Sequence, residues 1–421
     1  MTILDKEKRS AKVVAWTTSA VLLSLVLLSL APIVKANKVT DWNAIAAQTL
    51  VTAGNAGAAG AVDMAYTHIA IYESVNAIDG GYTVFAVSPS NVPHGASAEA
   101  ATVEAAYCIL ISLYPAQAAY LDAQHAASLA TIPDGQSKLD GIAVGDEVAT
   151  LFLASRVGDG RGANVPYTPG TGPGAWIPTS PAPPAAVWLS KMRPFAIESP
   201  TQFRPEPPPS LDSDEWAADY NEVKRMGALN SGERTPEQTT LARFFLDPGV
   251  PQDAGALRQL AIDKGLSLKD NARLFAQVYV AQADATIAGW DSKYHYGFWR
   301  PITAIRAGNT DGNPNTDADP TWTPLATTPN HPEYLSAHAF VDGAWTETLR
   351  QFFGTKKLDV TMTSTTTGTS MSFSNTDDIV KAVEDARVFA GFHYRTSCVR
   401  GAVLGKKVAK YVAKNYFQPV E

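Results

Sequence analysis

Apolar residues recur at helical spacing along most of this chain, and this periodicity restricts the possible folds more than any other feature. The pattern is dense from residue 37 to 160 and returns after residue 212, whereas the alternation typical of β-strands is scarce. Its segments are Ala61–Ala77, Ala96–Tyr114, Leu139–Val157, Ser213–Leu229, Thr235–Leu246, Ala254–Lys264, Leu268–Phe298, Ser336–Phe353, Asp377–Phe389 and Thr396–Tyr416. Amphipathic helices bury their apolar faces against one another. We therefore predict an all-α protein with a helical-bundle core, formed by two four-helix bundles and long loops.

A proline-rich segment, residues 161–211, separates the two helical regions. Pro and Gly interrupt it throughout, which excludes regular helix or strand over most of its length. Disordered linkers lack aromatic residues, whereas this segment contains several, so we predict an ordered strap packed on a helical body. Residues 37–421 are then one domain with N-terminal helices (37–160), the strap (161–211) and catalytic helices (212–421). The aromatic residues of the strap include Trp176, Trp188, Phe195 and Phe203.

Charge and cysteine content exclude several functional classes. The formal net charge is −7, with +3 in residues 1–36 and −10 in the rest of the chain. A chain this acidic, with no basic tract, is not expected to bind nucleic acid or an anionic membrane surface. Two cysteines, Cys108 and Cys398, are too few for a disulfide scaffold, a cysteine-rich zinc site or an iron–sulfur cluster. The sequence leaves open whether they pair.

Residues 1–36 have the organisation of an export signal. Basic residues lie between Lys6 and Lys12, and no charged residue occurs from Val13 to Val34. Val34-Lys35-Ala36 then resembles a cleavage site with small residues at both ends. We predict a signal peptide cleaved near Ala36, which leaves a periplasmic or secreted protein without membrane contact. The alternative is an uncleaved anchor, because the uncharged run is long enough to span a bilayer.

Two candidate motifs elsewhere are better explained as turns. Gly158–Gly162 is rich in glycine but has no nucleotide-binding context around it. Asp311–Asp319 resembles a calcium loop, yet Thr316 and Trp322 replace the glycine and glutamate that such a loop needs. We expect an Asx-rich turn there.

The first of three chemically related segments is Lys293–Pro301. Lys293 and Arg300 are seven residues apart, so on one helix they would project from the same face. Pro301 would end that helix. A solvated charge pair is the simplest interpretation, but the many aromatic residues in this segment favour a packed environment. A buried cation requires an anion.

The second segment is His331–His338. Ser336 precedes a helical pattern that ends at Gly354, so it is a natural N-cap and has no further role by itself. A helix N-terminus also offers free amides and a positive dipole to an oxyanion. His338, one turn into the helix, is then placed to act as an acid or base toward a bound group.

The third segment is Arg387–Arg395. On a straight helix Arg387 and His393 would point to different sides, but a break at Gly391 allows them to converge. His393 alone would be interpreted as a core histidine with satisfied hydrogen bonds. Together the three segments supply three cations, a helix-terminal hydroxyl and amide, and two histidines. This combination predicts a pocket for a tetrahedral or trigonal-bipyramidal oxyanion.

The triple pattern resembles the superfamily that joins type 2 phosphatidic acid phosphatases and vanadium-dependent haloperoxidases. The family has a lysine, six residues and Arg-Pro, then Pro-Ser-Gly-His, then Ser-Arg, five residues, His, three residues and Asp. Lys293–Pro301 matches the first part in full, and the context looks like the bacterial haloperoxidase-like branch over roughly residues 40–418. The departures are Leu335 and Ala337 in the second part and Ala386 and Ser397 in the third.

This resemblance implies a role for each matching residue. His393 would bond vanadium, and the cationic side chains would neutralise the vanadate oxygens. Ser336 and the Ala337 amide would donate hydrogen bonds to them. His338 would be the acid or base, so that His338, His393 and Lys293 are the expected catalytic residues. The cations are Lys293, Arg300 and Arg387.

The implied activity is oxidation of halide by hydrogen peroxide to hypohalous acid, with vanadate as cofactor. An exported acid phosphatase is the alternative, because phosphate and vanadate share shape and charge and His393 would then attack phosphorus. An inactive exported binding protein is a third possibility. Ser397 in place of Asp removes a possible orienting carboxylate. The oligomeric state and the organic substrate are not predicted.

His331 bears on the choice of halide. The resemblance places it beside the vanadate, where fungal chloroperoxidases carry Phe and algal bromoperoxidases carry His. A histidine there could titrate near neutrality and change local charge and water access. We therefore expect bromide or iodide to be preferred over chloride, which is the hardest of the three to oxidise. The alternative is a turn histidine that precedes Pro332.

Overall fold

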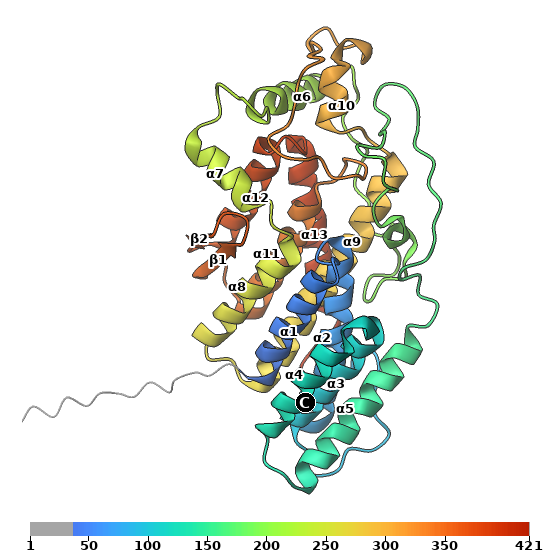
Figure 1. The fold of residues 1–421 in the computed structure, drawn as a ribbon, viewed down its shortest axis with the longest axis vertical. Helices are drawn as coiled ribbons and strands as arrows, with labels where there is room; N and C mark the ends of the chain where they lie inside the picture. The colour runs from blue at the N-terminus through green and yellow to red at the C-terminus, as the bar shows by residue number, and fades with distance from the viewer. Residues whose placement is uncertain (1–36, 421) are drawn as a thin grey trace, which may run out of the picture. The chain divides into compact units, whose positions relative to one another are not determined.

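Helices dominate the computed structural model, which describes residues 37–420 (Figure 1). The first five α-helices are α1 (Lys38–Thr52), α2 (Ala58–Asp79), α3 (Ala98–Leu113), α4 (Ala118–Ala130) and α5 (Gln136–Ser155). Eight more follow, α6 (Asp214–Met226), α7 (Pro236–Phe244), α8 (Gly249–Asp263), α9 (Leu268–Tyr296), α10 (Pro301–Arg306), α11 (Ala337–Phe353), α12 (Thr376–Phe389) and α13 (Arg395–Asn415). Three short 3-10 helices complete the set, η1 (Pro115–Gln117), η2 (Val187–Lys191) and η3 (Gly308–Thr310). The predicted all-α class is confirmed. The predicted export signal, residues 1–36, lies outside the described residues.

Within residues 37–420, one β-hairpin interrupts the helical architecture, and it was not predicted. Strands β1 (Val360–Ser364) and β2 (Thr369–Phe373) pair antiparallel, in a register that sets Met362 opposite Met371. Side chains of β1 alternate between buried and exposed, but most of them are Thr or Ser. Hydrophobic alternation is therefore too weak in the sequence to reveal the hairpin.

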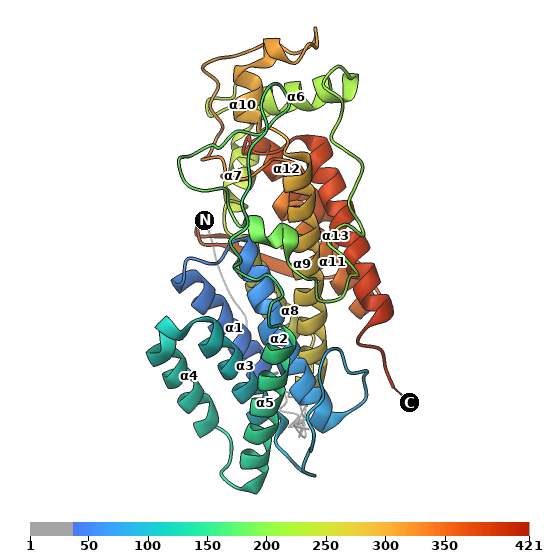
Figure 2. The ribbon, with the colours of Figure 1, turned by 90° about the vertical axis from the view of Figure 1, so that its right-hand side faces the viewer.

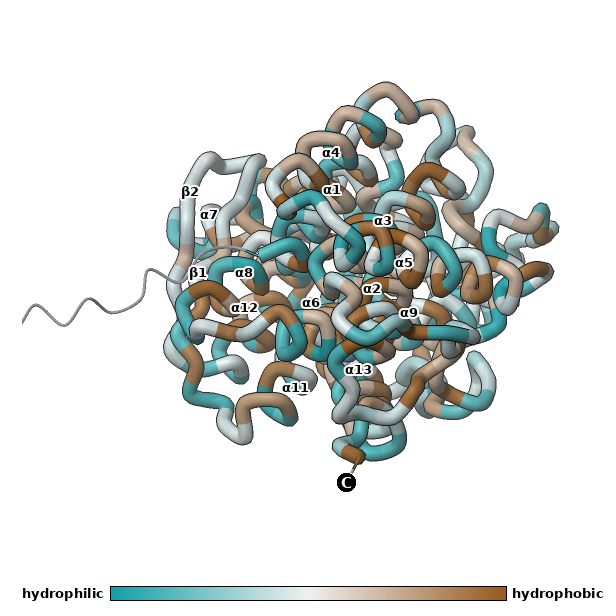
Figure 3. The backbone as a smooth tube through the Cα atoms, turned by 90° about the horizontal axis from the view of Figure 1, so that it is seen from below, coloured by the Kyte–Doolittle hydropathy of each residue, from teal (hydrophilic) through white to brown (hydrophobic). Residues whose placement is uncertain are grey.

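Helix α9 is the central element of the helical body. It packs against α2 on one side and against α11 and α13 on the other, and Figure 2 shows α11 and α13 beside it. Nearly every side chain from Asn271 to Lys293 is buried, which is typical of a helix surrounded by others. Brown, hydrophobic stretches of α2 and α3 lie in the middle of the view in Figure 3. No helix in residues 37–420 is both long and apolar enough to cross a membrane.

The proline-rich strap is tied to α9 by a buried carboxylate. Asp284 accepts hydrogen bonds from three consecutive backbone amides, Phe195 at 2.7 Å, Ala196 at 2.7 Å and Ile197 at 2.8 Å. Burial raises the pKa of Asp284 to about 6, while these amides favour its charged form. Within the strap, the backbone amide of Trp176 donates to the carbonyl of Gly297 at 2.6 Å. The order of the strap therefore comes from its contacts with the helical body rather than from regular secondary structure.

The helix that carries Lys293 ends earlier than predicted. Helix α9 stops at Tyr296 because Gly297 adopts a left-handed conformation with φ of +53°. Arg300 lies on an extended segment as the N-cap of α10, and Pro301 starts that helix. The prediction that Lys293 and Arg300 project from one helix face was wrong. A glycine C-cap and a proline N1 residue separate them into two elements.

The two cysteines do not pair. Cys108 lies on α3 and Cys398 is buried on α13, and each is a free thiol. Burial raises the pKa of both thiols, so neither is activated as a thiolate.

Candidate functional site

Residues from the second and third chemically related segments line one cavity of about 320 Å³, together with Trp290 just before the first segment. Trp290, His331, Ala337, His338, Arg387 and His393 contribute to its wall. The remaining candidate residues, Lys293, Arg300 and Ser336, have no solvent exposure and lie outside the lining. The tertiary structure thus gathers side chains that are up to a hundred residues apart in the sequence.

The N-terminus of α11 offers unused hydrogen-bond donors. Ser336 is the N-cap, as predicted, but its side chain makes no capping hydrogen bond. Its Oγ is buried and has no partner among residues 37–420. The first amides of any helix lack intrahelical acceptors, and Ala337 begins α11 at the edge of the cavity. A buried hydroxyl without a partner is costly, so this end of the helix is suited to an anion.

Lys293 connects α9 to the second segment. Its Nζ donates to the carbonyl of Pro332 at 3.2 Å, to that of Glu333 at 3.0 Å and to that of Leu335. Burial, and then the charge of Arg300, lower the pKa of Lys293 well below its ordinary value. All three acceptors are uncharged carbonyls, so an anion bound nearby would favour the charged form of this lysine.

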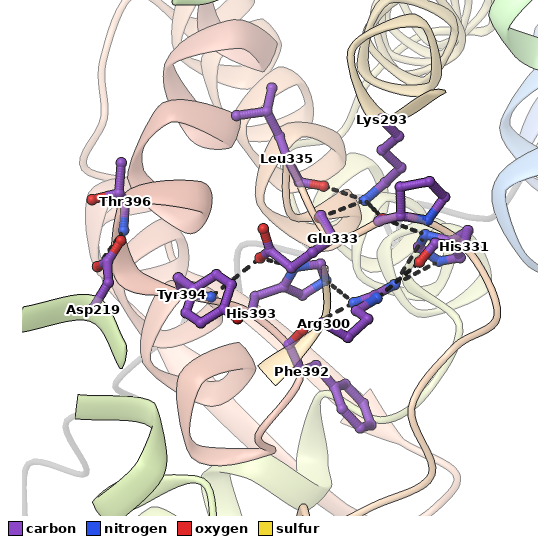
Figure 4. A network of polar contacts seen from close by, with 11 residues as sticks. Asp219, Lys293, Arg300, His331, Glu333, Leu335, Phe392, His393, Tyr394 and Thr396 are labelled. Atoms are coloured by element: carbon purple, nitrogen blue, oxygen red, sulfur yellow. Dashed lines mark hydrogen bonds and ion pairs between the residues drawn. The ribbon is translucent and has the colours of Figure 1, made fainter. Parts of the chain in front are cut away.

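Arg300 holds the second and third segments together (Figure 4). Its Nε donates to the carbonyl of His331 at 2.9 Å, and its Nη1 donates to that of Phe392 at 2.9 Å. The same Nη1 lies 3.2 Å from His393 Nε2. Burial lowers the pKa of Arg300 to about 10, so it keeps its charge at neutral pH.

Arg387 comes from the last turn of α12. Its Nη1 donates to the carbonyl of Phe245 at 2.6 Å, whereas its buried Nε has no partner among residues 37–420. The predicted break is present, because α12 ends at Phe389 and Gly391 has φ of +76°. An added Cβ at Gly391 would lie 2.6 Å from the carbonyl oxygen of Gly227, so the turn is also closely packed. The break turns the chain so that His393 and Arg387 line the same cavity.

None of these three cations forms a direct ion pair with a carboxylate, although the buried Glu333 acts on Lys293 and Arg300 from further away. Within residues 37–420, no carboxylate oxygen lies within 4.0 Å of the charged nitrogens of Lys293, Arg300 or Arg387. Buried charges are normally paired, because removing an ion from water is expensive. The site is therefore built to accept an anion.

The hydrogen bonds of His393 specify its tautomer. A guanidinium can only donate, so Nε2, at 3.2 Å from Arg300, must be the acceptor. The ring proton is then on Nδ1, which donates to Glu333 Oε1 at 2.8 Å. Burial lowers the pKa of His393 well below its usual value and keeps the ring neutral. Nε2 thus carries the lone pair of the ring, which faces Arg300 here and could bond a metal or attack a phosphorus in exchange for that contact.

His338 has the opposite arrangement. Its Nε2 donates to the carbonyl oxygen of Asp247 at 3.0 Å, so Nδ1 carries no proton. Burial, and then the charge of Arg387, lower the pKa of His338 to about 3. The Asp247 carboxylate accepts from Thr365 and Thr366 in the turn of the hairpin, which fixes the carbonyl that holds the ring. Sequence analysis missed Asp247, and a ring held by a main-chain oxygen leaves no signal in the sequence.

His331 does not titrate near neutrality, contrary to our expectation. Burial, followed by the charges of Arg300 and Lys293, lowers its pKa well below the usual value. Arg300 Nη2 lies 3.0 Å from its Nδ1, and its ring centroid lies 5.2 Å from that of Trp290. A neutral imidazole beside two cations is the stable state, so His331 can act through shape and hydrogen bonding but not through charge.

Glu333 is a second residue that sequence analysis missed. It has no solvent exposure, and its side chain joins the second segment to His393 (Figure 4). The available signal was a lone acidic residue inside a stretch expected to lie among three buried cations. Our sequence analysis considered only position 397 for an orienting carboxylate.

Comparisons with known proteins show which proteins this chain resembles. Residues 273–421 match the family model described as the VCPO second helical-bundle domain. A vanadium chloroperoxidase from Curvularia inaequalis is 29% identical over 192 residues, which cover 38% of this chain and 31% of that protein. The chain thus aligns with about a third of the length of this curated relative.

Solved structures resemble almost the whole chain. A bacterial vanadium-dependent iodoperoxidase superposes with a TM-score of 0.77 at 21% identity, covering 91% of this chain and 97% of that one. The holo form of a bacterial vanadium-dependent chloroperoxidase gives a TM-score of 0.67 at 15% identity, covering 85% and 92%. At these identities the likeness establishes the fold alone. Residues 273–421 are thus similar to the second helical-bundle domain of vanadium chloroperoxidases, and the chain shares its fold with bacterial vanadium-dependent haloperoxidases.

Proposed function

We propose that this protein is a vanadate-dependent haloperoxidase that oxidises halide with hydrogen peroxide. The observation that carries the proposal is the set of three buried cations without carboxylate partners beside the unprotonated Nε2 of His393. In the overall reaction, halide, hydrogen peroxide and a proton give hypohalous acid and water. The O–O bond breaks, an oxygen–halogen bond forms, and the halide loses two electrons.

The residues present fit vanadate as the bound group. His393 Nε2 would supply the single covalent bond, and the buried Ser336 Oγ and Arg387 Nε are donors without partners among residues 37–420. Lys293 and Arg300 would add positive charge from behind the cavity wall. The donor set is thus rich in nitrogen–hydrogen and hydroxyl groups, which suits the oxygens of a tetrahedral oxyanion.

Vanadate bound here would supply a Lewis acid that withdraws electron density from peroxide oxygen, without a change in metal oxidation state. The three cations stabilise the negative charge that collects on the reacting oxygens, and burial strengthens this effect because water is excluded. His338 would take up a proton at Nδ1 from hydrogen peroxide and return it to the leaving oxygen. The low pKa of His338 favours release of that proton, whereas its uptake depends on the negative charge of a bound anion, which raises the pKa.

Halide oxidation should require vanadate. Protein stripped with a chelator should lose its bromide and iodide oxidation, regain it on addition of vanadate, and be inhibited by excess phosphate, which competes for the same pocket. The measurement is bromination of a dye beside hydrolysis of a phosphate ester. Full activity after removal of vanadium would contradict the proposal. Rapid ester hydrolysis without halide oxidation would indicate the phosphatase alternative, in which His393 Nε2 attacks phosphorus.

We also propose that bromide or iodide is preferred over chloride. The presence of a neutral histidine, His331, between Trp290 and Arg300 supports this, because its hydrogen-bond contact with Arg300 draws part of the guanidinium away from the anion. Replacing His331 with Phe should free Arg300 and shift the relative kcat/KM toward chloride. A parent enzyme that prefers chloride, or an unchanged ratio in the variant, would argue against this role.

We propose further that the mature protein is exported. The basic, apolar and small-residue regions of residues 1–36 support this, and the mature chain should begin near Asn37. N-terminal sequencing of protein from the periplasm or medium is the measurement. Recovery of intact Met1 on membrane-bound protein would favour an anchor instead.

A further inference from the structure

The contacts of Glu333 extend to all three segments of the site. Its backbone amide donates to the carbonyl of Phe298 at 2.9 Å, and its own carbonyl accepts from Lys293 Nζ at 3.0 Å. Its side-chain Oε1 accepts from His393 Nδ1 at 2.8 Å and from the Tyr394 backbone amide at 3.2 Å. The main chain of Glu333 is thus fixed to the first segment while its carboxylate is fixed to the third.

Because both partners are buried, this hydrogen bond between a carboxylate and a neutral imidazole differs from an ordinary surface contact. Glu333 is 0% exposed and His393 is 1% exposed, so water does not compete for either hydrogen bond. The Tyr394 amide holds Oε1 in place, which leaves His393 Nδ1 with an acceptor of fixed position. Arg300 donates a hydrogen bond to Nε2 of His393, so the proton of the neutral ring must be on Nδ1. The Glu333 carboxylate can therefore only accept from Nδ1 and cannot donate to it.

Position 397 does not supply such a carboxylate in this chain. Ser397 lies in the first turn of α13, and its Oγ has no hydrogen-bond partner among residues 37–420. Its backbone carbonyl instead accepts from the Ser336 amide at 3.3 Å. The serine therefore helps to place the N-terminus of α11 and leaves the orientation of His393 to another residue.

We propose that Glu333 is the positioning residue of His393 and that it replaces, from the second segment, the carboxylate missing at position 397. It holds the ring as the Nδ1–H tautomer, directs the Nε2 lone pair toward the anion, and increases the basicity of that nitrogen. Partners of this kind behind a metal-bound histidine typically change metal affinity by about 10–100-fold. The effect on vanadate affinity rests on the proposed function, whereas the effect on the tautomer does not.

Glu333→Gln is the informative substitution, because it keeps the shape and an acceptor oxygen but removes the charge. We expect the Kd for vanadate, measured by equilibrium dialysis, to rise about 10–100-fold. Nitrogen-15 NMR of the unloaded wild-type protein should show His393 protonated on Nδ1, with a strongly downfield Nδ1 proton. In the variant, the NMR signal of the Nδ1 proton should shift upfield, because its hydrogen bond weakens.

Glu73→Gln is a matched control. Glu73 on α2 is also buried and accepts main-chain hydrogen bonds, from Phe85 at 2.8 Å and Val87 at 3.2 Å. It contacts none of the site residues, so its variant should bind vanadate as wild type does, even if its Tm falls. An equal loss of affinity in both variants would overturn the proposal, as would a change of less than about threefold in Glu333→Gln.

The NMR measurement keeps the two proposals separate. If wild-type protein binds no vanadate but His393 carries its proton on Nδ1, the haloperoxidase proposal fails and the positioning role stands. If Glu333→Gln does not fold, the spectrum of the wild-type protein still shows which nitrogen of His393 carries the proton. A wild-type His393 protonated on Nε2 would overturn the role of Glu333 directly.

Discussion

His393→Ala should abolish vanadate binding and, with it, halide oxidation. The variant removes the only nitrogen proposed to bond vanadium, while Lys293, Arg300 and Arg387 remain. Electrostatic attraction alone should hold the anion weakly, so we expect the Kd to rise by more than about 100-fold, beyond the effect of losing a partner behind the ligand. Equilibrium dialysis with vanadate, together with the bromide and iodide assays, measures both quantities.

His68→Ala is the matched control for this prediction. His68 on α2 is likewise fully buried, and its Nε2 makes a 2.9 Å hydrogen bond with Asn43 at a distance from the site. Its replacement should lower stability by creating a cavity but leave the Kd for vanadate unchanged. If His393→Ala retained vanadate with near-normal affinity, the ligand assignment would be wrong.

His338→Ala should give the complementary result, with vanadate bound and turnover lost. The proposed role of His338 is proton transfer through Nδ1, which a bound anion does not need in order to stay bound. General acid–base catalysis contributes about 10²–10⁴-fold, so kcat should fall by that factor while the Kd for vanadate changes only a few-fold. Steady-state kinetics on fully vanadate-loaded protein separates the two effects.

The contrast between the two histidines is the decisive comparison. Loss of binding to the same extent in both variants would show that His338 also holds the anion, which its contact with the Asp247 carbonyl does not suggest. An unchanged kcat in His338→Ala would remove it from the proton-transfer role. In that case a water molecule in the cavity would be the next candidate base.

The structure also explains why the site tolerates Ala337. Its side chain lies in the cavity wall, and the amide that precedes the methyl group is unaffected by it. An alanine at N1 is therefore compatible with an amide donor, although the methyl occupies space next to the proposed anion. No further consequence of this departure follows from the contacts of Ala337.

The sequence by itself determined the helical class and singled out three chemically related segments as the candidate site. Apolar spacing locates α2, α3, α5 and α9 within a few residues, because amphipathic and buried helices carry their own periodic signal. Gly391 predicted the break before His393 for a local reason, since a positive φ is favourable for glycine. Spacing and chemical type were enough to single out the three cations, of which Arg387 lines the cavity while Lys293 and Arg300 lie buried outside its lining.

The tertiary structure decided what those residues contact. The end of α9 at Gly297 separated Lys293 from Arg300, although an uninterrupted helix was equally consistent with their spacing. The tautomers of His338 and His393 depend on a carbonyl at Asp247 and a carboxylate at Glu333, both remote in sequence. Desolvation by the whole fold lowers the pKa of His331, and no local pattern contains that information. Residue type limits the possible chemistry, but burial and long-range contacts determine the protonation state in which each residue acts.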